Sequence, residues 1–123
     1  LLEELKRINP DRVEYEPVDE TGTCPEESLL RLIERLGGMD VYFHCSGIGH
    51  QNMNLDADTE LATVQTNSIG FTRMVGAAFR YFAEKGTGHI AVVSSIASVV
   101  PLPTPRRNAF RTYISKALPS SPA

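Results

Sequence analysis

Hydrophobic and polar positions along the chain follow the periods of alternating strands and helices. The first residues, 1–7, mix leucines with charged residues in the manner of the end of a helix. Between residues 11 and 19, apolar side chains alternate with charged ones, which predicts a strand. Pro17 weakens this strand near its end because proline cannot donate a backbone hydrogen bond.

The next segment carries the signals of a helix start and a helix stop. Thr23 offers a capping side chain, Pro25 suits the first turn, and Glu26 follows Thr23 by three residues. Gly37 and Gly38 supply the stop. The apolar positions between them recur at intervals of three and four: Leu29, Leu32, Ile33 and Leu36.

A second strand, a long helix and a third strand follow in order. Residues 39–45 are a short apolar run, typical of a strand buried on both faces of a parallel sheet. Asp56 or Asp58 caps the long helix, which Gly86 and Gly88 end. One predicted face of this helix steps by three or four residues, with Ser68 among its apolar positions Leu61, Val64, Phe71, Val75, Ala78 and Phe82. Residues 89–95 are again apolar and predict the third strand.

This order predicts an α/β layer fold with a parallel sheet and right-handed crossovers, of which three strands and their helices are in view. After Ser98 the pattern dissolves, since Pro101, Pro103 and Pro105 are too dense for a regular element. A short helix is expected over 109–118. We therefore expect one domain over residues 1–118 and a tail over 119–123.

Composition narrows the classes of function. The chain has 123 residues, 12 Lys and Arg against 15 Asp and Glu, and a net charge of −3, so it lacks the basic face of a nucleic-acid-binding module. No apolar run reaches the length of a membrane span. Cys24 and Cys45 are too few for a disulfide framework or a metal site, which favours a reducing, cytoplasmic setting.

Candidate chemistry gathers where the predicted strands end, because ligands of open parallel sheets bind at the carboxyl ends of the strands. Asp19 follows the first strand, residues 45–49 follow the second, and Ser94 and Ser95 follow the third. The turn at Ser46 and Gly47 lets backbone approach a ligand closely. His44 and Cys45 point to opposite faces of their strand, so we expect His44 in the core and no thiol–imidazole pair.

Four stretches together, in this order and spacing, resemble the short-chain dehydrogenase/reductase family. They are Asp19, residues 39–49, residues 66–71 and residues 86–97, and the resemblance covers roughly residues 1 to 98. It implies the middle of one NAD(P)-binding domain with a Rossmann-type, doubly wound parallel sheet, in which hydride passes between the cofactor and a small carbonyl or alcohol substrate. The resemblance is also compatible with a homo-oligomer of the intact protein.

The resemblance also implies roles for single residues. Asp19 stands where the family has an acid near the adenine ring, and Cys45, Ser46 and Gly47 lie in the turn that lines the cofactor. Asn67 is similar to the proton-relay Asn of the family. Ser95 matches the Ser that hydrogen-bonds the substrate carbonyl.

Two hypotheses exist for the positions of the catalytic Tyr and Lys. Tyr113 and Lys116 are the candidate pair, but they lie three positions apart instead of four, and farther from Ser95 than in the family. Alternatively, dropping one base from codons for Tyr-Ser-Ala-Thr-Lys yields Thr-Pro-Arg-Arg-Asn, the sequence of residues 104–108. Thr104 and Asn108 would then mark the lost catalytic positions.

The phosphate-binding loop and the last strands of the family have no counterpart in these residues. We therefore expect an incomplete dehydrogenase domain that is inactive by itself and binds NAD or NADP poorly, and that is marginally stable or prone to aggregation. The alternative is a non-catalytic, degenerate copy that acts as an interaction or structural protein.

Overall fold

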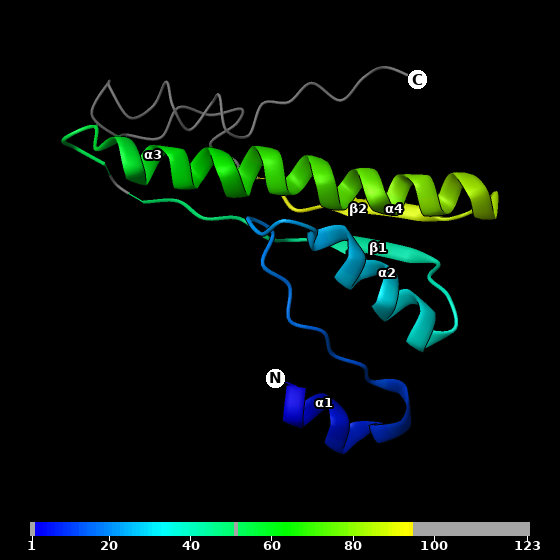
Figure 1. Ribbon diagram of the computed structural model, residues 1–123. Coiled ribbons are helices and arrows are strands. Elements are labelled where there is room, and N and C mark those ends of the chain that lie inside the picture. The colour runs from blue at the N-terminus through cyan, green and yellow to red at the C-terminus, as the bar shows by residue number, and fades with distance from the viewer. Residues whose placement is uncertain (1, 51, 95–123) are drawn as a thin grey trace.

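The computed structural model describes residues 2–50 and 52–94. Helix α1 has no buried residue and lies at the N-terminus, apart from α2, α4 and the strands (Figure 1). The elements in chain order are α1 (Leu2–Ile8), the 3-10 helix η1 (Pro10–Arg12), α2 (Pro25–Leu36), β1 (Val41–His44), α3 (Ala57–Val64), the π-helix η2 (Gln65–Gly70), α4 (Phe71–Lys85) and β2 (His89–Val92).

The two strands pair in parallel, which confirms the predicted α/β class. Val41 is opposite His89 and His44 is opposite Val92. The backbone N–H of Val93 donates to the carbonyl of His44 at 2.8 Å, so the pairing continues past β2. Helices α3, η2 and α4 form one rod that joins the strands and runs alongside them (Figure 1). This β-α-β unit is the repeating element of a Rossmann-type sheet.

One hydrophobic core holds α2, α4 and β1 together. Ala78 of α4 has no exposed surface, so the helix backbone approaches its neighbours closely there. The buried apolar residues are Leu29 and Ile33 of α2, Tyr42 of β1, and Met74, Ala77, Ala78 and Phe82 of α4. Since α2 and α4 share a core with the same strand, both cover one face of the sheet.

Strand β1 is covered on one face only, so the prediction of burial on both faces was wrong. Tyr42 and His44 are buried, whereas Val41 is 59 % and Phe43 62 % exposed. Successive side chains of a strand point to opposite faces, and the core lies on one of them. The other face of the sheet is an open apolar surface.

Helix α2 forms where the sequence predicts it, with its cap one residue later than expected. Cys24, instead of Thr23, occupies the N-cap, and no side chain caps the helix. Pro25 stands at the first helical position, where its missing N–H costs nothing. Gly37 ends the helix with a φ of 76°, a left-handed conformation that glycine adopts without strain.

The strand predicted between residues 11 and 19 is absent from the described sheet. Its start is the 3-10 helix η1, and the remainder is extended backbone that pairs with neither β1 nor β2. Ion pairs on α2 hold it instead: Arg35 contacts Glu14 and Glu16 at 2.8 Å, and Arg31 contacts Glu16 at 3.1 Å. An alternating pattern of apolar and charged residues does not show whether a neighbouring strand is present to form the hydrogen bonds of a sheet.

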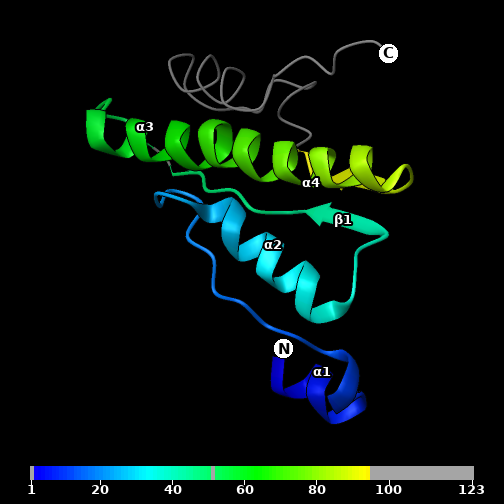
Figure 2. The same cartoon turned by 45° about the vertical axis from the view of Figure 1, so that its right-hand side comes forward.

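The long helix begins at Asp56, one of its two predicted caps. The Asp56 carboxylate accepts a hydrogen bond from the backbone N–H of Thr59 at 2.9 Å. The predicted apolar face was correct for Ala78 and Phe82, but Leu61 is 65 % exposed. Figures 1 and 2 show the α3 end of the rod running past the two strands, and Leu61 belongs to α3. The π-helix also shifts the phase of the pattern.

The third predicted strand is confirmed as β2. Ser95 and the residues after it, including Tyr113, Lys116, the 104–108 stretch, the helix over 109–118 and the tail over 119–123, lie outside the described residues. No helix of the part that is described has both the length and the apolar character needed to cross a membrane.

We predict that Gly88→Ala destabilises the fold. A Cβ at Gly88 would lie 2.0 Å from the ring of Phe82, a core residue, so either the ring or β2 must move. Overpacking of this kind costs about 1–3 kcal/mol. Urea unfolding of Gly88→Ala should show this loss. Gly49→Ala, whose Cβ would have nothing within 4 Å, is the control and should leave stability unchanged.

We predict that acid releases residues 13–18 from α2. The hydrogen bond from Arg31, aided by Arg35, holds the pKa of Glu16 below its ordinary value, so the contribution of Glu16 is present at neutral pH and fades as pH falls below about 4. The Nε–H resonances of Arg31 and Arg35 should lose their protected shifts over that range in an NMR titration. Glu16→Gln should show the released signals already at pH 7; unchanged signals in that variant would contradict the role of this carboxylate.

Candidate functional site

Two loops meet at the carboxyl end of β1 and contain all the described candidate residues except Asn67, which lies in the π-helix η2. The Gly47 loop (residues 45–49) leaves the strand, and the Asp19 loop (residues 19–24) precedes α2. Figure 2 shows the loop before α2 beside the segment that leaves the arrowhead of β1. Within the described residues, the sheet edge predicted to bind ligand therefore consists of these loops and of Ser94, which follows β2.

Asn67 fixes the Gly47 loop through both atoms of its side-chain amide. Its Oδ1 accepts a hydrogen bond from the backbone N–H of Ile48 at 2.8 Å, and its Nδ2 donates to the Ile48 carbonyl at 2.7 Å. A Cβ at Gly47 would lie 3.3 Å from Asn67 Oδ1, which explains the glycine at this close approach. Asn67 lies in the π-helix, a distortion that is frequent at functional sites.

Asp19 forms a compact turn with the residues that follow it. Its Oδ1 accepts from the backbone N–H of Thr21 at 2.9 Å and from the Thr21 hydroxyl at 2.6 Å. These hydrogen bonds lower the pKa of Asp19, so its exposed carboxylate is ionised at neutral pH. The turn closes with the Gly22 N–H donating to the Asp19 carbonyl at 3.0 Å.

A buried polar cluster lies between the two loops. Nδ1 of His44 is 2.9 Å from the Tyr42 hydroxyl and 3.9 Å from Oε1 of Glu20. Burial, with the charge of Glu20 nearby, raises the pKa of Tyr42 to about 12, so this hydroxyl stays protonated. His44 is 4 % exposed and packs edge-on against Phe71. Its predicted core position is confirmed.

The remaining candidates of the Gly47 loop face solvent. Cys45 and Ser46 are exposed, with neither thiol nor hydroxyl hydrogen-bonded within the described ranges. His44 points into the core while Cys45 points out, as expected for neighbours on a strand. Over residues 2–50 and 52–94 no group of three His, Cys, Asp or Glu side chains is arranged to hold a metal ion.

Three residues at this edge were missed by the sequence reasoning: Glu20, Gly70 and Arg73. A Cβ at Gly70 would lie 2.9 Å from Cβ of Glu20, so helix and loop touch there. Arg73 donates to the Gly22 carbonyl at 2.8 Å and to the Thr23 carbonyl. The sequence signal for Arg73 is a charged residue directly before Met74, which the structure buries.

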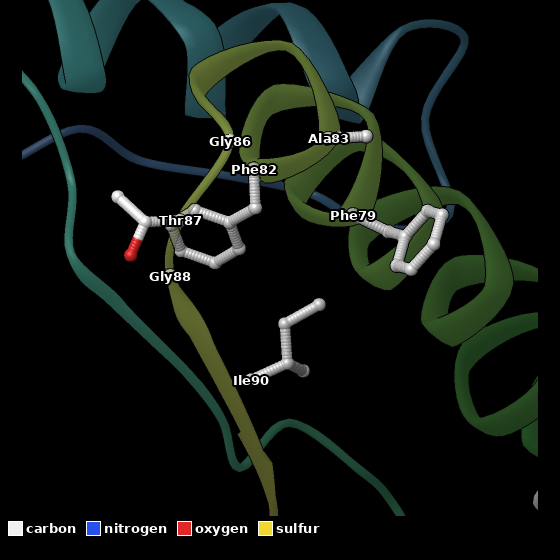
Figure 3. Close-up of a pocket in the computed structure, with 7 residues that line it drawn as sticks. All are labelled: Phe79, Phe82, Ala83, Gly86, Thr87, Gly88 and Ile90. Carbon is white, nitrogen blue, oxygen red and sulfur yellow. The ribbon is translucent and has the colours of Figure 1, made fainter. Parts of the chain in front are cut away.

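An apolar groove lies at the opposite end of the sheet. It runs between the C-terminal half of α4 and β2, and its lining includes Phe79, Phe82 and Ile90 (Figure 3). Because Gly88 and Ile90 mark the amino end of β2, this groove is remote from Asp19 and Gly47. It carries no polar side chain except that of Thr87 and offers no catalytic chemistry.

Comparison with known proteins gives one consistent family. The model of the short chain dehydrogenase family matches residues 2–106. A curated relative, dehydrogenase/reductase SDR family member 7B of Danio rerio, is 23 % identical over 100 residues, which cover 80 % of this chain and 32 % of that protein.

Solved structures show the same fold. Levodione reductase superposes with a TM-score of 0.75 at 21 % identity, over 90 % of this chain and 45 % of that one. An alcohol dehydrogenase from Thermococcus sibiricus, complexed with 5-hydroxy-NADP, has a TM-score of 0.75 at 21 % identity over 93 % of this chain and 49 % of its own. The chain thus spans less than half the length of each of these relatives.

We predict that Asn67→Ala loosens the Gly47 loop. The variant leaves the N–H and the carbonyl of Ile48, both half-buried, without their partners, at a cost of about 1–3 kcal/mol. Amide exchange at Ile48 should accelerate, and urea unfolding should report the loss. Asn54→Ala, at an exposed position with no hydrogen bond of its own, is the matched control and should change stability by less than about 0.5 kcal/mol.

Proposed function

The chain belongs to the short-chain dehydrogenase family, and we propose that its β-α-β unit forms the adenosine side of an NAD(P) site in an oxidoreductase. The observation that carries the proposal is the carboxyl edge of β1, where Asn67 holds the Gly47 loop and His44 lies against Glu20 of the Asp19 loop. This places an ionised carboxylate and a glycine turn at the edge where α/β sheets bind nucleotides.

The residues present fit an adenosine group. Asp19 uses Oδ1 within its turn, while Oδ2 makes no hydrogen bond within the described part of the chain and faces solvent. A carboxylate oxygen of this kind accepts from an adenine amino group. The exposed backbone at Ser46 and Gly47 would line the ribose side, since no Cβ at Gly47 stands in the way.

The reaction proposed for the complete protein is hydride exchange with a small carbonyl or alcohol. The nicotinamide supplies or takes the hydride when bound. Ser95 would hydrogen-bond the substrate carbonyl, with Tyr113 as general acid/base and Lys116 lowering its pKa. Asn67 supports the scheme indirectly: its side chain is occupied by Ile48, which leaves its main chain as the part available to hold a water.

The chain as given would be an incomplete domain, spanning 1–118 with a tail over 119–123. The share of the relatives that it covers, less than half, supports this proposal. A reducing, cytoplasmic setting fits its two unpaired cysteines. Under the alternative, a degenerate copy without catalysis, the open apolar face at Val41 and Phe43 would serve contacts with other chains.

We predict that the chain binds NADPH weakly and through the adenosine half alone. Saturation-transfer NMR at millimolar NADPH should show transfer to the adenine and ribose protons and little to the nicotinamide protons. Asp19→Ala should abolish the adenine signal, whereas Asp58→Ala, an exposed acid on α3, should leave it unchanged.

Two results would contradict this proposal. Micromolar binding in titration calorimetry would show that these residues form a complete cofactor site. Absence of any transfer to adenine, or transfer that survives Asp19→Ala, would remove the proposed role of the carboxyl edge.

A further inference from the structure

Apart from Glu27, in the first turn of the adjoining helix α2, Arg73 is the only residue outside the Asp19 loop that donates hydrogen bonds to it within residues 2–50 and 52–94. Nη1 donates to the carbonyl of Gly22 at 2.8 Å, and Nη2 donates to the carbonyl of Thr23. The other hydrogen bonds of the loop are local, from Thr21 and Gly22 to Asp19 and from the Glu27 N–H to Cys24. Arg73 therefore ties this turn to the helix, and without that tie the local hydrogen bonds of the turn should open more often.

The guanidinium group suits this task better than any other side chain. Its planar fork presents several N–H donors in fixed directions, so one residue can serve two successive carbonyls. The same group forms an ion pair with Glu26 at 2.7 Å, and the side chains of both residues are about seven-tenths buried. The hydrogen bond from Arg73 lowers the pKa of Glu26, which keeps the pair charged at neutral pH.

Helix and loop are also in steric contact next to Arg73. Gly70 lies one turn earlier on the same helix, and a Cβ there would be 2.9 Å from Cβ of Glu20 and 3.1 Å from its carbonyl oxygen. Gly70 sets how closely the loop can approach, and Arg73 sets where it lies along the helix. Asn67, in the turn before Gly70, fixes the Gly47 loop in the same way.

We propose that Arg73 is a positioning residue for the adenosine site. By binding the carbonyls of Gly22 and Thr23, it places the Asp19 carboxylate at a fixed distance from the Gly47 loop. The two loops keep this distance because Arg73 and Asn67 bind them to the same helical rod. The proposal rests on the proposed function for its ligand. Its structural part, the placement of the Asp19 loop by Arg73, is independent of any ligand.

The test compares Arg73→Met, Arg73→Lys and the control Arg80→Met in the full chain. Arg80 is an exposed arginine on the same helix with no hydrogen bond to either loop. In Arg73→Met, amide exchange at Thr21 and Gly22 should accelerate about tenfold. Exchange at Ile48 and at Ala78 should stay within about twofold, and Arg80→Met should match the wild type at all four amides.

The second readout is saturation transfer to the adenine protons of NADPH. It should fall about fivefold or more in Arg73→Met and be partly retained in Arg73→Lys, which keeps the charge beside Glu26 but cannot serve both carbonyls in one plane. If Arg73→Met does not fold, Arg73→Lys decides by the same two readouts, with intermediate effects expected.

The outcomes separate the two proposals. Uniform acceleration of exchange across the chain would assign Arg73 a general structural role and overturn the inference, as would unchanged exchange at Thr21 and Gly22. Adenine transfer that is equal in wild type and Arg73→Met would overturn it as well. If wild type shows no transfer at all, the proposed function fails, while selective acceleration at Thr21 and Gly22 would still establish Arg73 as the residue that places this loop.

Discussion

The packing of α4 on β1 is the contact from which the rest of the described structure follows. Ala77 and Ala78 have small side chains, and Ala78 has no exposed surface, so the helix backbone comes close to its neighbours. Phe82 then fills the space at one end, against the glycine at position 88, and Met74 fills the other. Because the contact is made by a rigid helix over several turns, it fixes both the distance and the rotation of the helix relative to the strand.

That fixed rotation is what brings the polar residues of the helix to the loops. Asn67, Gly70 and Arg73 follow one another along the rod toward Met74, the start of the buried stripe. When the buried residues of α4 pack on β1, these three residues lie beside the loops at the carboxyl end of β1. The packing of this one rigid helix in the core therefore sets where the site residues lie. The hydrogen bonds of Asn67 and Arg73 then fix the loops against them.

The same arrangement leaves one face of the sheet without cover. Among the described residues the sheet has two strands and two unpaired edges, and the exposed side chains of Val41 and Phe43 present an apolar surface that water solvates poorly. The family relatives are more than twice as long as the part of them matched here, which accords with a sheet that extends further and is covered on both faces in a whole domain. Ion pairs from α2 to Glu14 and Glu16 keep the segment before Asp19 in place without a neighbouring strand.

Short-range rules in the sequence determined α2, the long helix and both described strands, but not the segment over residues 11–19. The stop at Gly37, the cap at Asp56 and the apolar runs around β1 and β2 depend on residues close in the chain, so they were predictable. The order of these elements, with the stretches that resemble the family, was enough to predict the α/β class and the edge at which Asp19 and Gly47 lie.

Only the tertiary structure decided which surfaces are covered and which groups meet. Burial of Phe43 and Leu61 was wrongly predicted because apolarity shows that a residue can be buried, and not whether another element covers it. The links from Asn67 to Ile48 and from Arg73 to Gly22 join residues far apart in sequence. Local patterns carry no information on such pairs, which exist because the packing of α4 on β1 brings them within hydrogen-bonding distance.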